Sequence, residues 1–262
     1  MTFMRWILLT DKRCIDISRY SKEYLSEHNK DFSFESILSD VRRGKVVESL
    51  KKYSPSNIVE IGCGLVPIFC EYPYFKEYYL VEPSEEFINN AKNLAKNRQN
   101  ITLIQDYFEN AYQKIRALKI DFIIASSLLH EVHDPEKLLT SIKDLCNPNT
   151  IVHINVPNVY SFHRLLAKEM GIIKDTFDIS DTERKFQRST RFDKKIFLDC
   201  IESSGFSILS FGTYFIKPFN NSQMEYLLTS EVADLKIIEG LNRMTKYLPE
   251  MGCEMFAEIR LR

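Results

Sequence analysis

The sequence predicts an α/β fold in which a mostly parallel sheet is covered by helices on both faces. From residue 57 onward, strand-sized apolar runs alternate with amphipathic helical segments, which is typical of such sheets. The first run, 57–61, ends in Gly62-Cys63-Gly64, as expected where a strand passes into a helix. The last run, 253–261, alternates apolar and polar residues, which indicates an antiparallel strand near a sheet edge.

The predicted elements follow in chain order. Residues 15–53 have the apolar spacing of helices and precede the sheet. Seven runs predict strands, at 57–61, 78–81, 101–104, 120–125, 151–156, 206–211 and 253–261. Helices are expected after the N-caps Ser84, Asp134 and Asp193, at about 160–170 before Gly171, and as one long segment at about 223–247. The polar stretch 172–191 has no assigned element.

Composition excludes several classes of protein. The chain has 262 residues, 44% of them hydrophobic and 27% charged, which is ordinary for a soluble globular protein. The 35 Lys and Arg residues nearly balance the 36 Asp and Glu residues, so no nucleic-acid partner is expected. No apolar stretch reaches the roughly 18 residues of a membrane helix, and residues 1–10 are interpreted as structure and not as a secretion signal. The six scattered cysteines predict a reduced, cytoplasmic protein.

The main candidate site is the turn at 62–64 together with Glu82, which ends the second predicted strand. Ligands bind such sheets outside the carboxyl ends of the strands, where an acid can accept both hydroxyls of a ribose. Glu60 lies inside the first strand and needs a partner, either a ligand ammonium or the backbone of the glycine loop. Positions 65–68 lack the third glycine that a pyrophosphate requires. A nicotinamide-dependent oxidoreductase is therefore not expected, whereas S-adenosylmethionine, which has no phosphate, is.

With these motifs, the chain resembles the class I S-adenosylmethionine-dependent methyltransferases over residues 55–156, and more loosely over 206–262. The resemblance implies a Rossmann-like, doubly wound, seven-stranded sheet with an antiparallel C-terminal strand, N-terminal helices and a helical lid after strand 5. The implied domains are an N-terminal helical cap at 1–54 and a methyltransferase domain at 55–262, with a lid insertion at about 157–192.

The resemblance also implies S-adenosylmethionine as the cofactor and S-adenosylhomocysteine as the product. The implied cofactor-binding residues are Glu60, Gly62, Cys63, Gly64, Glu82, Asp106, Tyr107 and Ser126. Val66 stands where the family often has a further glycine, which changes the local fit.

A second group of motifs is similar to small-molecule methyltransferases of bacterial surface-polysaccharide and secondary-metabolite pathways. These motifs are Val156-Pro157-Asn158, Ser161, His163-Arg164, Met170-Gly171 and Lys217-Pro218. The similarity implies that the lid covers a small-molecule acceptor.

The acceptor side offers two histidines as catalytic candidates. An oxygen acceptor usually needs a base, and histidine suits that task at neutral pH. His130 follows the fourth strand and His163 lies in the expected lid, where Tyr160 and Arg164 are the substrate-binding candidates, Arg164 for an anionic group. His153, inside the fifth strand, is expected to be a core residue.

Two charged stretches of the sequence lie close to these candidates. The run His130-Glu131-Val132-His133-Asp134 is one residue short of the zinc-binding pattern His-Glu-x-x-His, so no metal site is expected. The basic stretch 184–195 is either a solvated face or a cover for an anionic small molecule.

The sequence thus predicts direct methyl transfer to an oxygen of a small polar metabolite, such as a sugar, a sugar nucleotide or a capsule or lipopolysaccharide precursor. The sequence leaves open whether the acceptor is anionic and whether the protein forms a homodimer. The alternative is a non-catalytic methyltransferase-fold subunit that serves a partner, which exposed apolar surface on the helix at 223–247 would favour.

Overall fold

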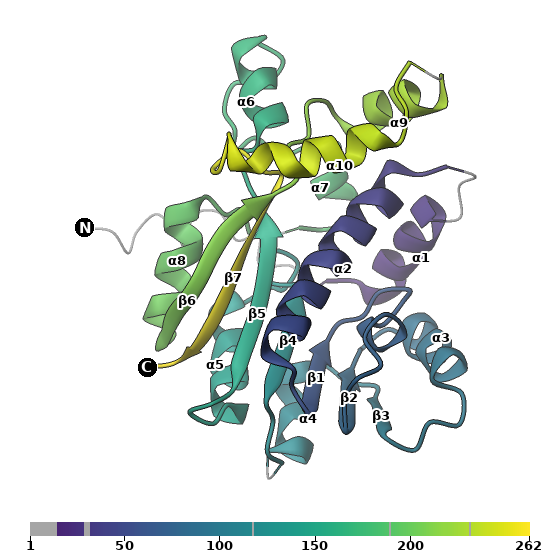
Figure 1. The fold of residues 1–262 in the computed structure, drawn as a ribbon, viewed down its shortest axis with the longest axis vertical. Helices are drawn as coiled ribbons and strands as arrows, with labels where there is room; N and C mark the ends of the chain where they lie inside the picture. The colour runs from purple at the N-terminus through teal and green to yellow at the C-terminus, as the bar shows by residue number, and fades with distance from the viewer. Residues whose placement is uncertain (1–14, 29–31, 117, 189, 231) are drawn as a thin grey trace.

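A seven-stranded sheet forms the centre of the molecule (Figure 1), in the order β3-β2-β1-β4-β5-β7-β6. The computed structural model describes residues 15–28, 32–116, 118–188, 190–230 and 232–262. The strands are β1 (Asn57–Ile61), β2 (Glu77–Val81), β3 (Ile101–Ile104), β4 (Phe122–Ser126), β5 (Ile151–Pro157), β6 (Phe206–Tyr214) and β7 (Glu254–Leu261). Strands β1 to β5 pair in parallel, and β7 runs antiparallel to both β5 and β6. The predicted Rossmann-like sheet with an antiparallel C-terminal strand is confirmed.

Helices cover both faces of this sheet, as predicted. They are α1 (Ile17–His28), α2 (Phe34–Tyr53), α3 (Glu85–Ala95), α4 (Phe108–Ile115), α5 (Pro135–Leu145), α6 (Phe162–Glu169), α7 (Asp181–Lys185), α8 (Lys194–Ser203), α9 (Asn221–Thr229) and α10 (Lys236–Arg243), with the 3-10 turns η1 (Ile68–Cys70) and η2 (Met244–Lys246). Apolar residues of α4, α5 and α8 form the core on one face, and those of α2, α3 and η1 form the core on the other. Within the described ranges, no helix is both long and apolar enough to cross a bilayer.

The predicted helix starts are confirmed. The side chains of Ser84, Asp134 and Asp193 each accept a hydrogen bond from the backbone N–H three residues later, at Phe87, Lys137 and Ile196. These bonds satisfy donors that the first turn of a helix leaves unpaired, so the local sequence is enough to place the start of each helix.

The polar side of β7 is buried and does not face solvent. Glu254 and Glu258 are only 5% and 3% exposed, because β7 is the second strand from the edge and α2 supplies partners for both acids. Arg42 of α2 binds Glu254, and Ser49 of α2 donates a hydrogen bond to Glu258 over 2.7 Å. The alternation in this strand therefore marks a polar seam between the sheet and α2.

The connection from β1 to β2 differs from the predicted strand-to-helix turn. Residues 62–76, all of which the structure describes, contain the three-residue turn η1 and no α-helix. Pro67 precedes η1 and Pro73 follows it, and a proline inside a helix removes a backbone donor and clashes with the preceding turn. The segment after β1 therefore stays a loop.

The prediction of one helix at 223–247 is wrong, because the segment splits into α9, α10 and η2. At the end of α9, the hydroxyl of Thr229 donates to the carbonyl of Glu225 over 2.8 Å, and Ser230 donates to Tyr226 in the same way. Such side-chain bonds compete with the helical backbone pattern and end the helix.

The stretch 157–192 forms a small helical unit beside the carboxyl ends of the strands, where α6 and α7 lie (Figure 1). Nε of Arg164 in α6 donates to the carbonyl of Thr176 over 2.8 Å, and its Nη1 lies 3.3 Å from Glu183 of α7. Phe192 then pairs with Asn158 in a short parallel bridge, which brings the two ends of the stretch together.

Candidate functional site

A cavity of about 640 Å³ opens at the carboxyl ends of the central strands. Its size suits a small-molecule site, and it lies where the strand order reverses between β1 and β4, which is where such sheets bind ligands. We call one part the cofactor end, formed by Glu60, Gly62, Cys63, Gly64, Glu82, Tyr107 and Ser126. We call the other part the acceptor end, formed by Tyr20, Tyr24, Glu35, Arg42, Glu131 and Arg188.

The cofactor end brings together seven of the eight predicted cofactor residues, and Asp106 is the exception. The carboxylate of Asp106 is outside the described cavity wall and accepts hydrogen bonds from Asn110 over 3.1 Å and from the backbone of Tyr107 over 2.9 Å. It also lies 3.4 Å from Lys114. Asp106 therefore holds the start of α4, and Tyr107, which is 48% exposed, is the residue of this segment that lines the cavity.

The glycine loop has a left-handed backbone at both glycines. Gly62 and Gly64 have φ angles of +71° and +56°, a region that residues with a Cβ rarely adopt. A Cβ on Gly64 would lie 3.0 Å from the hydroxyl oxygen of Tyr24, so α1 packs directly over the loop. Both positions need glycine, Gly62 for its conformation and Gly64 also for the close approach of Tyr24.

Glu82 is a buried carboxylate at the tip of β2. It is 5% exposed and accepts hydrogen bonds from the backbone N–H groups of Cys63 over 3.0 Å and Ser84 over 2.8 Å. Burial raises the pKa of Glu82 to about 7, although these backbone donors act against the rise. Each oxygen keeps acceptor capacity, so the vicinal hydroxyls of a ribose fit this position.

Glu60 lies deeper, at 3% exposure, and braces the loop after the glycine turn. It accepts hydrogen bonds from the hydroxyl of Tyr78 over 2.6 Å and from the backbone N–H of Ile68 over 3.2 Å. Burial raises the pKa of Glu60 to about 7. Its backbone partner is thus the start of η1 rather than the glycine loop, and contact with a ligand ammonium stays a prediction.

The acceptor end is centred on Glu131, which follows β4. The Tyr20 hydroxyl donates to Glu131 over 2.8 Å, Nε of Arg188 lies 3.4 Å away, and Nε2 of His130 lies 3.5 Å away. Burial raises the pKa of Glu131, but the contacts from His130, Arg188 and Tyr20 outweigh burial and leave the pKa below its ordinary value. Glu131 is therefore ionised at neutral pH.

The two predicted catalytic histidines lie behind the described cavity wall. His130 is 2% exposed and reaches the cavity only through Glu131. Burial lowers the pKa of His130, so its imidazole is neutral at pH 7. Burial also holds the pKa of His163 well below its usual range, with Lys217 and Arg164 adding to the effect. The structure brings neither histidine into the position from which it would contact an acceptor directly.

The predicted substrate residues of the lid also lie away from the described cavity. Tyr160 is 44% exposed, and its ring packs edge-on against Phe177 at 6.1 Å. Arg164 is held by the lid itself, through Thr176 and Glu183. His153 is the core residue that the sequence predicted, and its Nδ1 lies 3.0 Å from the hydroxyl of Ser49.

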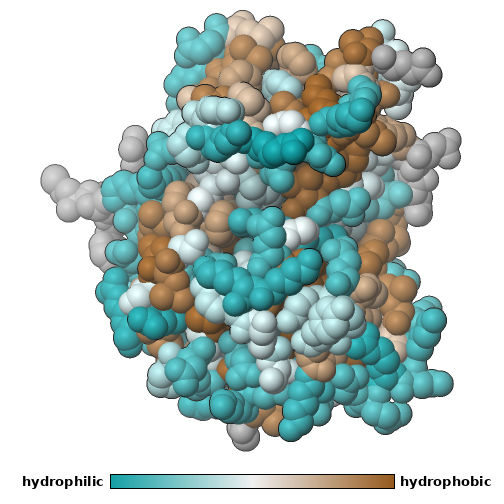
Figure 2. All heavy atoms as spheres, viewed as in Figure 1, coloured by the Kyte–Doolittle hydropathy of each residue, from teal (hydrophilic) through white to brown (hydrophobic). Residues whose placement is uncertain are grey.

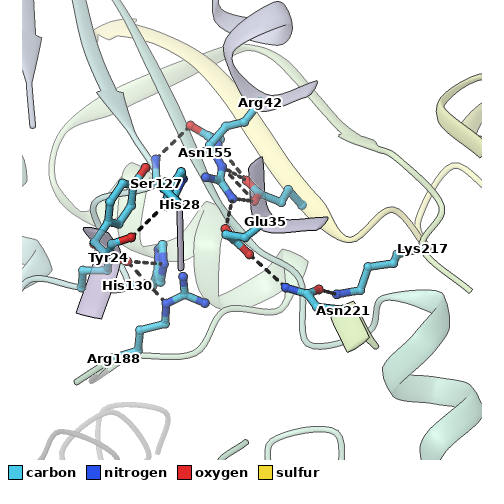
Figure 3. A network of polar contacts seen from close by, with 12 residues as sticks. Tyr24, His28, Glu35, Arg42, Ser127, His130, Asn155, Arg188, Lys217 and Asn221 are labelled. Atoms are coloured by element: carbon cyan, nitrogen blue, oxygen red, sulfur yellow. Dashed lines mark hydrogen bonds and ion pairs between the residues drawn. The ribbon is translucent and has the colours of Figure 1, made fainter. Parts of the chain in front are cut away.

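A chain of buried polar contacts links the acceptor end to the strand ends (Figure 3). In order, it runs through Lys217, Asn221, Glu35, Arg42, Glu254, Asn155 and Ser127. At its centre, Nε of Arg42 donates to Glu254 over 2.9 Å, and Arg42 overcomes the effect of burial and lowers the pKa of Glu254 to about 2. At its end, Asn155 accepts from the backbone N–H of Ser127 over 3.0 Å and fixes its left-handed φ of +56°.

Sequence reasoning missed the residues that build the acceptor end: Tyr20, Tyr24, Glu35, Arg42, Glu131 and Arg188. Glu131 lies in the run 130–134, for which no metal site is expected, and Arg188 lies in the basic stretch 184–195. That stretch has two kinds of residue, since the side chains of Arg184 and Lys195 are 66% and 70% exposed, whereas those of Arg188 and Arg191 are 17% and 5% exposed. The available signal was an aromatic residue two positions before the cation, in Phe186-Gln187-Arg188.

Comparisons with known proteins agree with this arrangement. A family model described as "Methyltransferase domain" matches residues 33–210. The plantazolicin methyltransferase BamL, solved in complex with a triazolic desmethylPZN analog and SAH, has a TM-score of 0.52 and 15% identity, over 94% of this chain and 96% of that chain. The N-methyltransferase NodS of Bradyrhizobium japonicum, in complex with S-adenosyl-l-homocysteine, has a TM-score of 0.56 and 11% identity, over 93% and 98%.

A third similar structure is the complex between the Trm112 methyltransferase activator of Haloferax volcanii and a methyltransferase, with a TM-score of 0.56 and 10% identity, over 93% and 96% of the two chains. At these identities the three structures establish a likeness of fold. No curated protein matches this sequence. The family model, however, spans more than half of the chain. The chain therefore belongs to the methyltransferase-domain family, whose cofactor is S-adenosylmethionine.

Proposed function

We propose that this methyltransferase transfers the methyl group to an oxygen of a small polar acceptor, which binds at the acceptor end of the cavity. The observation that supports the proposal is that one cavity joins Glu82 and the glycine loop to the ionised carboxylate of Glu131. The cofactor and the acceptor must share about 640 Å³, which favours a small acceptor over a macromolecule. Sugars, sugar nucleotides and capsule or lipopolysaccharide precursors remain the acceptors we propose.

At the cofactor end, we propose that Glu82 accepts hydrogen bonds from the ribose hydroxyls and that Tyr107 lies along the adenine. We propose that the amino-acid part of the cofactor lies beside the glycine loop, because Gly62 and Gly64 line the cavity. S-adenosylmethionine supplies a methyl group on a positively charged sulfur. Ser126, at the end of β4, lines the passage to the acceptor end.

At the acceptor end, we propose that Glu131 accepts the hydrogen bond of the acceptor hydroxyl and takes its proton as the new bond to oxygen forms. Tyr20 fixes the direction of the carboxylate through its hydrogen bond and so acts as a positioning residue. Helix α1 closes over the glycine loop through Tyr24 and excludes water, which lets alignment and desolvation assist the reaction. In this proposal α1 and residues 186–188 together form the cover of the site, and the rest of the predicted lid supports them.

The test is methyl transfer from S-adenosylmethionine with a labelled methyl group to the low-molecular-mass fraction of a cell extract. We expect the label in a small molecule as an alkali-stable ether. Glu131→Gln should lower the rate by about 100-fold, the typical contribution of a positioned base, and leave the affinity for S-adenosylhomocysteine unchanged. Glu136→Gln, an exposed acid of α5, is the matched control. Label in protein or nucleic acid alone, or an unaffected Glu131→Gln variant, would contradict the proposal.

Partner binding is the second candidate function, because apolar side chains are exposed in the segment 223–247. Tyr226, Val232, Leu235 and Tyr247 are between 65% and 72% exposed, and Figure 2 shows apolar surface near α9 at the top of the molecule. We propose that this surface supports assembly, as a homodimer or with another chain, in an active enzyme. Light scattering of the purified protein tests the homodimer, and a monomer at all concentrations would contradict it. The described cysteines are all unpaired, which favours the proposed cytoplasmic location.

A further inference from the structure

Arg188 is an arginine with unused donors at the acceptor end of the cavity. Its side chain is only 17% exposed, and its Nε lies 3.4 Å from Glu131. Among the described residues, Arg188 makes its hydrogen bond and its ion pair through Nε, to Glu131, and its two terminal amino groups make neither. Arg188 lines the cavity, and a guanidinium has five N–H donors, so the donors of its two terminal amino groups are available to a ligand oxygen.

The neighbours of Arg188 hold it in place. Gln187 has a left-handed φ of +54°, and its side-chain amide forms two hydrogen bonds with the backbone of Asp16, over 3.0 and 3.1 Å. Lys185 lies 3.2 Å from Glu23 of α1, and the ring of Phe186 lies 5.5 Å from the guanidinium. Because residues outside the favoured backbone regions persist where the surroundings fix them, Arg188 is a positioned group and not a mobile surface side chain.

The other two arginines of the cavity already have anionic partners. Arg42 binds Glu254 with two hydrogen bonds from Nε, and Arg43 forms an ion pair with Glu71. Of the three arginines on the described cavity wall, Arg188 alone keeps both terminal nitrogens for a ligand. Figure 3 shows its guanidinium beside the side chain of His130, below the network of Arg42.

We propose that the acceptor carries a carboxylate or phosphate group and that the two terminal nitrogens of Arg188 bind this group as a fork. The planar pair of N–H donors matches two oxygens of one anion, which a lysine cannot do. Glu131 occupies the Nε edge, so the anion binds at the opposite edge and leaves the reacting hydroxyl beside Glu131. This inference rests on the proposed function and narrows the acceptor to an anionic, hydroxyl-bearing small molecule.

The experiment uses the full chain saturated with S-adenosylhomocysteine and titrates it with inorganic phosphate or glycolate in a calorimeter. We expect one of the two anions to bind, and its identity distinguishes a phosphate from a carboxylate group. Arg188→Gln should weaken this binding by at least about 10-fold, as expected when a charge-assisted pair is lost, and Arg188→Lys should restore it only in part. Arg184→Gln, at a side chain 66% exposed on α7, should change it by less than about 2-fold.

The affinity for S-adenosylhomocysteine separates the two levels of the proposal. If the wild-type protein does not bind S-adenosylhomocysteine, the proposed function itself fails. If it does, and Arg188→Gln keeps this affinity but binds the anion as well as the wild type, only the role of Arg188 is wrong. The proposal is also overturned if neither anion binds at concentrations up to about 50 mM, which exceed the dissociation constants of weak specific complexes. Should Arg188→Gln not fold, Arg188→Lys gives the comparison.

Discussion

The two ends of the cavity are built from different kinds of contact. The cofactor end uses short segments at or just after the ends of β1, β2, β3 and β4, and Glu82 reaches the backbone of Cys63 only 19 positions away. The acceptor end joins distant segments, since Tyr20 meets Glu131 across 111 positions and Arg42 meets Glu254 across 212. Local motifs therefore reveal the cofactor end, whereas the acceptor end exists only once α1, α2 and residues 186–188 have packed against the sheet.

The pKa of the buried acid at the cofactor end and the pKa of the buried acid bound to Arg42 of the acceptor end are shifted in opposite directions. Glu82 has only neutral backbone and thiol donors, so burial raises its pKa to about 7. Glu254 binds Arg42, which lowers its pKa to about 2. Because the unfolded values are near 4.5, Glu82 makes the protein less stable as the pH rises from 4.5 to 7. Glu254 contributes stability above pH 4.5, and this contribution is lost as the pH falls towards 2.

The largest effect should come from removing Glu254, the buried acid that binds Arg42 of the acceptor end. Glu254→Gln leaves Arg42 buried with Glu35, 3.6 Å away, as its remaining ion-pair partner among the described residues. We expect the free energy of unfolding at pH 7 to fall by about 3 kcal/mol, measured by denaturant titration. The control is Glu250→Gln, whose side chain is 70% exposed beside Lys194 and should matter by less than about 0.5 kcal/mol. Equal losses in the two variants would show that the buried network does not hold the acceptor end.

A smaller effect, on binding, should come from the cofactor end. Glu82→Ala removes the proposed ribose acceptor, so the dissociation constant of S-adenosylhomocysteine should rise by about 100-fold, the effect of one strong hydrogen bond to a charged group. Calorimetry measures this change directly. Asp106→Ala is the matched control, because its carboxylate is bound to Asn110 outside the described cavity wall, and we expect less than about a 2-fold change. A larger effect at Asp106 than at Glu82 would reverse the assignment.

The smallest effect distinguishes the two ends by its sign. Glu82→Gln replaces an acid whose ionisation is unfavourable in the folded protein, so the ligand-free variant should be more stable than the wild type at pH 8, by about 1 kcal/mol. Thermal unfolding at pH 3 and pH 8 measures the difference, which should vanish at pH 3 because Glu82 is then protonated in both the folded and the unfolded state. A destabilised variant at pH 8 would mean that Glu82 has a cationic partner and resembles Glu254.

The sequence was sufficient for the strands, the helix caps and the placement of Glu82, because each depends on nearby residues. It was insufficient where a side chain had a choice of partners. The carboxylate of Asp106 accepts a hydrogen bond from Asn110 and pairs with Lys114. The hydroxyl of Thr229 donates to a backbone carbonyl and ends α9. After β4, Glu131 lines the described cavity, whereas the adjacent His130 is buried behind its wall, and nothing in the sequence of this loop distinguishes the two positions.

The most direct test of the account is a crystal structure of the protein with S-adenosylhomocysteine bound. We predict that both ribose hydroxyls lie within hydrogen-bond distance of the Glu82 carboxylate and that the sulfur faces the space between Glu131 and Arg188. A nucleoside bound outside this cavity, or a sulfur directed away from Glu131, would contradict the division into a cofactor end and an acceptor end.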